Sequence, residues 1–381
     1  MIWVMLYIML GIYAFVYEKI DDRLKKSIFC IAIIGLSILA GTRNVQVIST
    51  WGGADDYVYM TLYQETPKLD KIFTAWNSGS RIGGYEIGYA VFTSVLKTIG
   101  LSYYGVIIVI SSIFYISVYI GFKRYIGDYS IFVLTLMYKL FTYYTMVAMR
   151  QCLAMSVFFL SIPLLEKKKL MPYLLMCVLA ITFHNGSLYL PFVYILMVIP
   201  LDKEKYITIN IVFAITLIVE ILHINVFGFV EAILSNIKFI SSKKIDTLGN
   251  EAGGISWLHT FEYYTIVYMI TTQYNNITCK EKNGEFIIRV MLAIAPVFTL
   301  FSQYLLFTRI KDYFTLFYGI IITYIIKYYS IREQKIIRLA FIIWAIYGFF
   351  RHILNFGGGL YYRYYESNII SIIRGAISLF Q

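Results

Sequence analysis

Three ionisable residues, Arg150, His184 and Arg309, each lie at one end of a long apolar run. The charges in the connecting loops put these three ends on the same side of a membrane. Ionisable groups at membrane depth are costly, and they usually mark function. Two guanidiniums and an imidazole gathered at one face predict a site for an anion, and phosphate is the natural ligand.

Further residues beside these apolar ends extend the predicted substrate-binding set, namely Arg43, Gln151, Lys311 and Tyr313. For Arg150 the alternative is a snorkelling side chain. Basic residues usually collect in cytoplasmic loops, whereas Arg150 is predicted to lie on the outer side. This unusual location favours a functional role for Arg150. His184 either caps a helical hairpin by hydrogen bonding or acts as a general base or phosphate ligand.

Acidic side chains suited to catalysis lie in an expected outer loop. Asp55 and Asp56 end a glycine-rich segment, and Glu86 stands between Gly84 and Gly88. Each could act as a base or bind sugar hydroxyls, and the alternative is a solvated turn. Because adjacent carboxylates point apart, Asp55 and Asp56 alone do not predict a metal site. The sequence has no P-loop and no dinucleotide fingerprint, so no nucleotide cofactor is expected.

The composition indicates an all-α polytopic membrane protein. Of 381 residues, 59% are hydrophobic and only 14% are charged, and the mean hydropathy is +0.70. A soluble protein of this length needs more surface charge, so the expected partner is the lipid bilayer. The formal net charge of +11 is explained by basic cytoplasmic loops and does not require a nucleic acid.

The apolar runs predict about twelve transmembrane helices, since a span needs roughly 20 apolar residues. They lie near residues 2–17, 27–42, 105–121, 129–148, 150–165, 170–184, 187–200, 207–223, 261–274, 287–307, 312–329 and 339–354. Basic residues collect in alternate short loops, which are predicted to be cytoplasmic. Both termini then lie outside.

Two long loops, 43–104 and 224–260, and a tail from Phe356 are expected to face outward. The apolar stretch 87–99 is too short for a span, and it predicts a re-entrant or interfacial helix on the outer side. Residues 1–381 are expected to form a single polytopic domain.

Taken in order, these segments resemble the EpsG-like family of Wzy-type polysaccharide polymerases. The matching pieces are Thr42-Arg43, Gly52-Gly-Ala-Asp-Asp-Tyr57, Gly84-Tyr-Glu-Ile-Gly-Tyr89, Arg150-Gln151, Phe183-His184-x-x-Ser187 and Arg309-x-x-x-Tyr313-Phe314. Their order and spacing carry the resemblance. The usual loop pattern of the family reads closer to Gly-Thr-Asp-Tyr, so either aspartate could correspond.

The resemblance implies a GT-C-like, inverting and metal-independent glycosyltransferase in a bacterial inner membrane, with its active site facing the periplasm or exterior. It would join oligosaccharide repeat units carried on undecaprenyl diphosphate into O-antigen or a related surface polysaccharide. Fixed cations would stabilise the departing diphosphate, and His184, Asp55 or Asp56 would take the proton of the acceptor hydroxyl. A chain-length regulator and a flippase of the same pathway are the expected protein partners.

Three other functions use similar chemistry. A flippase or transporter of lipid-linked oligosaccharide would also need cations in a cavity, but transporters are often built from repeats with midplane sites, and no repeat is evident. An O-antigen ligase-like transferase would differ in its acceptor. A membrane acyltransferase would use a catalytic histidine with an acyl donor, for which the sequence has no specific signal.

Overall fold

A computed structural model describes residues 2–45, 55–78, 81–222, 254–302 and 304–355. All the secondary-structure elements in these ranges that are longer than a single residue are helices, which confirms the predicted all-α class. The chain divides into two compact units. Unit 1 comprises Met1–Leu164, Met171–Ser187 and Lys335–Gln381, and unit 2 comprises Leu165–Leu170 and Leu188–Gln334.

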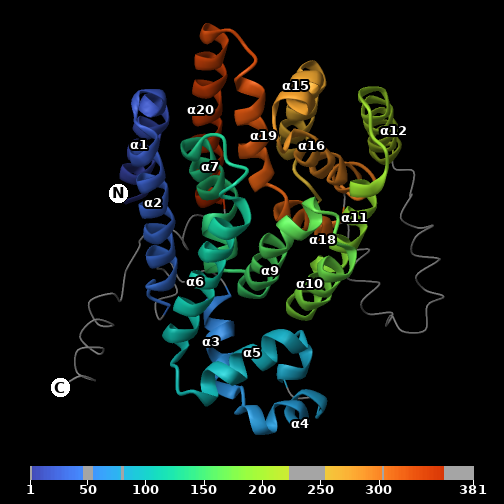
Figure 1. The fold of residues 1–381 in the computed structure, drawn as a ribbon. Coiled ribbons are helices and arrows are strands. Elements are labelled where there is room, and N and C mark those ends of the chain that lie inside the picture. The colour runs from blue at the N-terminus through green and yellow to red at the C-terminus, as the bar shows by residue number, and fades with distance from the viewer. Residues whose placement is uncertain (1, 46–54, 79–80, 223–253, 303, 356–381) are drawn as a thin grey trace. The chain divides into compact units, whose positions relative to one another are not determined.

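Unit 1 holds the N-terminal helices and the last helix of the described chain (Figure 1). α2 packs along α6, while α1 and α2 both contact α7. A π-helical turn over Met137–Phe141 joins α7 to α8, and within it Lys139 Nζ lies 4.0 Å from the centre of the Tyr138 ring. The helices that lie wholly or mostly in unit 1 are α1 Ile2–Val16, α2 Asp22–Gly41, α3 Asp56–Glu65, α4 Ile72–Asn77, α5 Ile87–Thr98, α6 Tyr103–Phe122, α7 Tyr129–Leu136, α8 Thr142–Met146, α9 Met149–Glu166, α10 Leu170–Phe183 and α20 Ile331–Asn355.

Unit 2 is built around α15, which contacts α12, α16 and α19. α11 also packs on α16, and the ring of Tyr263 on α15 stacks on Phe298 of α17 with centroids 4.6 Å apart. The helices are α11 Leu190–Val198, α12 Lys203–Ile221, α15 Trp257–Lys280, α16 Gly284–Ala293, α17 Ala295–Phe298, α18 Leu305–Ile310 and α19 Leu316–Ile326.

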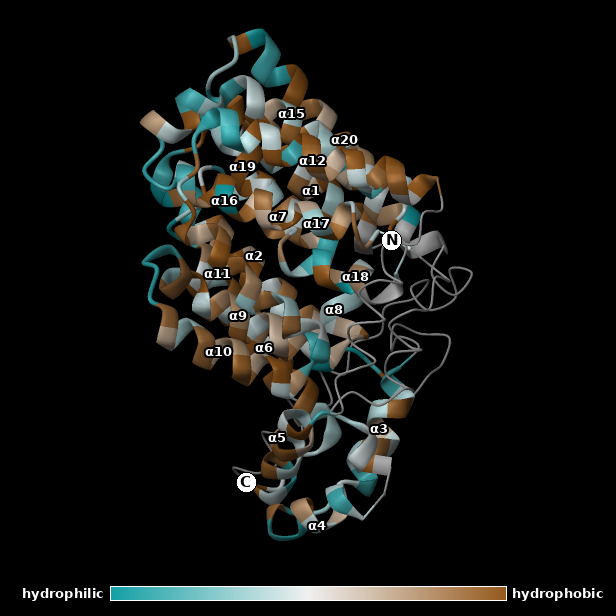
Figure 2. Ribbon diagram, turned by 90° about the vertical axis from the view of Figure 1, so that its right-hand side faces the viewer, coloured by the Kyte–Doolittle hydropathy of each residue, from teal (hydrophilic) through white to brown (hydrophobic). Residues whose placement is uncertain are grey.

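Three helices of the described chain, α2, α6 and α9, are long and apolar enough to cross a membrane. Shorter apolar helices include α10 and α19. Large apolar side chains on α1 and α2 point outward, with Phe15 80% and Ile31 69% exposed, and Figure 2 shows strongly hydrophobic colouring on α2, α6, α9 and α10. Such surfaces suit a hydrocarbon environment. The full count of about twelve spans and the GT-C-like architecture stay predictions.

The described part of the predicted outer loop 43–104 is largely helical. α5 covers the stretch expected to form a short helix, while α3 and α4 were not expected. The apolar residues Tyr59, Leu62 and Tyr63 follow a helical spacing along α3, and all three are buried. α3, α4 and α5 gather at one end of unit 1 in both views (Figures 1 and 2).

Two other predicted outer segments fall mostly outside the described residues. The loop 224–260 is described only from residue 254, and α15 already begins at Trp257, earlier than the predicted span at 261. The tail from Phe356 lies wholly outside them.

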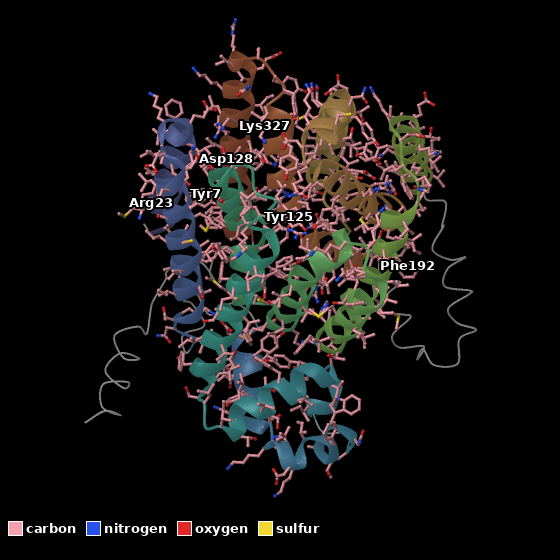
Figure 3. The ribbon with its side chains drawn as sticks, viewed as in Figure 1. Tyr7, Arg23, Tyr125, Asp128, Phe192 and Lys327 are labelled. Carbon is pink, nitrogen blue, oxygen red and sulfur yellow. The ribbon has the colours of Figure 1, made fainter. Side chains whose placement is uncertain are left out.

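An ion-paired cluster fastens three helices of unit 1 at residues predicted to be cytoplasmic. Asp128, labelled in Figure 3, accepts hydrogen bonds from the backbone N–H groups of Ser130 and Ile131 and so caps the start of α7. Arg338 of α20 donates to the carboxylates of Asp128 and Glu18 and to the carbonyl oxygen of Ala14. α1, α7 and α20 are therefore held by charge-assisted bonds.

Candidate active site

Arg150 lies in the first turn of α9, with its side chain 25% exposed. Its Nη1 donates to Glu86 Oε2, and its Nε donates to the hydroxyl of Tyr59 at 3.3 Å. The ring of Tyr85 lies 4.8 Å from the guanidinium carbon, within reach of a cation–π interaction. The guanidinium is thus held by a residue of α3 and by the N-cap residue of α5.

Glu86 connects this cation to the segment that carries His184. Its Oε2 accepts from Arg150, and its Oε1 accepts from the backbone N–H of Asn185 at 3.3 Å. The Glu86 side chain is only 12% exposed. One carboxylate therefore brings Arg150 and the end of α10 into one cluster, although these residues are far apart in sequence.

His184 directly follows α10 and is 6% exposed. Its Nδ1 lies 3.1 Å from the backbone nitrogen of Gly186. Because a backbone N–H can only donate, Nδ1 must be the acceptor, and the neutral ring then carries its proton on Nε2. In this arrangement Nε2 is a hydrogen-bond donor, which suits contact with an anion better than removal of a proton.

Arg43 and Asp56 form a buried ion pair. Nε and Nη2 of Arg43 donate to the two carboxylate oxygens of Asp56 at 2.9 and 2.8 Å, and Tyr103 Oη donates to Asp56 Oδ1 at 3.4 Å. Arg43 also donates to the carbonyl oxygens of Ala40, Thr145 and Met146. Both side chains are at most 1% exposed, so the pair joins α2, α3 and α8 and offers no surface to a substrate.

The two adjacent aspartates have opposite environments. Asp56 is the first residue of α3 and is buried, whereas Asp55 precedes the helix and is exposed. Burial raises the pKa of Asp56 to about 6, and the guanidinium of Arg43 opposes this rise. Burial also raises the pKa of Tyr59, with Arg150 lowering it and Asp55 adding to the rise. Asp55 directly precedes α3, the helix whose Tyr59 contacts Arg150.

Three further predicted site residues, Arg309, Lys311 and Tyr313, lie in unit 2. Arg309 is in the last turn of α18 and is partly exposed. Lys311 and Tyr313 are buried, and Lys311 Nζ donates to Asp312 Oδ1 at 2.6 Å. Their approach to Arg150 and His184 stays a prediction. In unit 1, Gln151 is also buried, at the start of α9.

A comparison with protein families matches residues 26–367 to the EpsG family. The chain belongs to the EpsG family. This confirms the resemblance drawn from the motifs and suggests a role in polysaccharide polymerisation. Neither the comparison with curated proteins nor that with solved structures gives a match.

Several residues of this EpsG-family site were not singled out by the sequence. Tyr59 and Tyr103 contact Arg150 and Asp56, and the backbone amide of Asn185 binds Glu86. Among the residues that were missed, only Tyr85 could have been found from the sequence, because it lies inside the same glycine-rich motif as Glu86. Among the described residues of the EpsG-family chain, no group of three or more His, Cys, Asp or Glu side chains could hold a metal ion.

Steric crowding explains why residue 88 of the glycine-rich motif, Gly84 to Tyr89, is a glycine. A methyl group at this position would overlap the side chain and the carbonyl oxygen of Thr182, so α5 and the end of α10 touch only because residue 88 is glycine. Gly84 has open space instead.

We expect Gly88→Ala to destabilise the protein by about 1–3 kcal/mol, the usual cost of overpacking. It should also reduce activity, since it pushes Glu86 away from Asn185. Gly84→Ala is the matched control and should leave both properties near wild type. Thermal unfolding of the detergent-solubilised protein measures the difference, and equal midpoints for the two variants would contradict the tight packing.

Proposed function

We propose that this EpsG-family chain is a Wzy-type polymerase that joins oligosaccharide repeat units carried on undecaprenyl diphosphate. It would act by inverting glycosyl transfer at the outer face of the bacterial inner membrane, without a metal ion. The observation that carries this proposal is the family match over residues 26–367. The cluster of Arg150, Glu86 and the His184 segment supports it, because it offers a fixed cation beside hydrogen-bond donors.

In the proposed reaction the hydroxyl oxygen of the acceptor repeat unit attacks the anomeric carbon of the lipid-linked donor. The new C–O bond forms as the bond to the diphosphate oxygen breaks, and the hydroxyl proton goes to a base. Negative charge grows on the departing diphosphate, where Arg150 would stabilise it. Arg309 would add a second cation if the two units bring it to the same site.

The geometry supports distinct roles for the other two candidates. The Nε2 proton of His184 makes it a donor to the diphosphate or to a sugar oxygen. Asp55 is an exposed carboxylate directly before α3, the helix that carries Tyr59, and it is the better candidate for the base. Arg43 and Asp56 act by positioning α3 against α2 and α8.

This division of roles predicts a difference between two variants at His184. Glutamine can accept the N–H of Gly186 through its carbonyl oxygen and donate from its amide, so His184→Gln should keep at least about a tenth of the wild-type rate. His184→Ala has neither group and should lose about a hundredfold or more, by analogy with removal of one oxyanion-hole donor. Rates are measured as polymer formed from a lipid-linked repeat unit. Loss of all activity in the glutamine variant would restore His184 as the proton acceptor.

The test of the proposed function is reconstitution of the purified chain in liposomes with a lipid-linked repeat unit. A polymerase lengthens the glycan, which appears as a ladder on a gel. A flippase would move the substrate across the bilayer without lengthening it. A ligase-like transferase would pass the glycan to a different acceptor and give no ladder from the repeat unit alone, so absence of a ladder with active transport or ligation contradicts the proposal.

A further inference from the structure

We propose that Glu86 is a built-in counter-charge that lowers the affinity of Arg150 for diphosphate and so allows the leaving group to depart. This inference rests on the proposed function, because it takes the diphosphate to bind at Arg150. It assigns Glu86 to tuning that cation, whereas the sequence suggested direct contact with the substrate.

The guanidinium of Arg150 uses two of its three nitrogens for hydrogen bonds within the described chain. Nε and Nη1 donate to Tyr59 and Glu86, whereas Nη2 donates to no residue of the described chain. The side chain is 25% exposed, so part of it is open to a ligand. A planar guanidinium held at two of its nitrogens presents its other donors in a fixed direction, which suits recognition of a phosphate oxygen.

Two hydrogen bonds fix the position of the Glu86 carboxylate beside Arg150. Its two oxygens are bonded to Arg150 and to the backbone N–H of Asn185, and the side chain is mostly buried. A diphosphate oxygen on Nη2 would lie within one guanidinium width of this carboxylate. Like charges at such a separation repel appreciably in a partly buried site, where screening by water is weak.

The neighbours of the pair do not cancel this repulsion. In the described chain the guanidinium also contacts Tyr59 and Tyr85, and neither side chain carries a positive charge. Asp55, directly before α3, has the same sign of charge as Glu86. The local charge of the Arg150–Glu86 pair is therefore close to zero, so the site binds diphosphate by directed hydrogen bonds more than by net charge.

A weakened cation suits an enzyme that must release one diphosphate for every bond it forms. Product release limits the turnover of many enzymes, and only interactions that are stronger in the transition state speed the chemical step. The donors of Arg150 can still meet the charge that develops on the leaving oxygen. The carboxylate limits how tightly the same donors hold the fully charged product.

The experiment is a binding titration of the full chain in detergent with inorganic pyrophosphate, at fixed ionic strength. Glu86→Gln and Glu86→Ala both remove the carboxylate charge, and each should bind pyrophosphate about tenfold more tightly than wild type, or about 1.4 kcal/mol. Tyr59→Phe removes a neutral contact from the same guanidinium and should change the affinity by less than about threefold. In the polymer assay, Glu86→Gln should be inhibited by about tenfold less pyrophosphate.

The outcomes separate this inference from the proposed function. If Arg150→Ala binds pyrophosphate like wild type, the phosphate role of Arg150 is wrong. If Arg150→Ala loses binding while both neutral Glu86 variants bind like wild type or more weakly, only the counter-charge is wrong. Failure of both Glu86 variants to fold also contradicts a tuning role, and it assigns the carboxylate to the packing of α5 alone.

Discussion

Replacing Arg150 by alanine should lower the rate of polymer formation by about a hundredfold to a thousandfold, the usual effect of removing one donor to a developing oxyanion. The side chain is a partly exposed cation of the unit 1 cluster, and it is fixed by Glu86 and Tyr59. Arg150→Lys keeps the charge but loses the planar fork, so it should recover only part of the rate.

The control for this variant is Arg23→Ala, which removes an exposed arginine near the start of α2 (Figure 3). It should polymerise at the wild-type rate. Gel ladders from membranes with equal protein levels measure both variants. A wild-type rate for a well-expressed Arg150→Ala protein would remove Arg150 from the reaction.

Replacing Asp56 by alanine should cost about 3–5 kcal/mol of stability, because it leaves the guanidinium of Arg43 buried without its counter-charge. Asp55→Ala is the matched control one residue away. Asp55 is exposed and its side chain makes no capping bond, so this change should stay within about 0.5 kcal/mol. Thermal unfolding in detergent measures the difference.

The two aspartate variants also separate stability from catalysis. Asp55→Ala should remain folded but lose activity if Asp55 is the base, whereas Asp56→Ala should lose folded protein. A double variant, Arg43→Met with Asp56→Leu, should regain part of the stability, since no charge is then buried. Its recovery should be incomplete, because the carbonyl oxygens of Ala40, Thr145 and Met146 lose their donor. Equal unfolding of Asp55→Ala and Asp56→Ala would contradict the buried pair.

The helices could be predicted from sequence because long apolar runs leave few alternatives for a backbone that must bond within itself. α2, α6 and α9 follow the predicted runs closely, and α5 occupies the predicted short helix. α3 and α4 were missed because their apolar residues are too few to stand out from a polar loop. Their stability comes from contacts with distant segments, such as the ion pair from Arg43 to Asp56.

The sequence could single out individual candidate residues but not the side chains that contact them. Arg150, His184 and Glu86 are isolated charged or polar groups beside apolar runs, and that isolation made them visible. The bond between Glu86 and Arg150 joins residues 64 positions apart, and no local pattern records such a pair. Asp55 and Asp56 could not be distinguished, because only the first turn of α3 decides which of the two is buried.

The most direct test of the polymerase reaction is to count the lipid diphosphate released as the glycan grows. The purified chain is reconstituted with a lipid-linked repeat unit, and the free lipid diphosphate is quantified beside the ladder. A Wzy-type polymerase should release about one lipid diphosphate for each linkage formed, and Arg150→Ala should lower both together. Transport of the substrate with no released lipid diphosphate, or growth of the glycan without that release, would contradict the account.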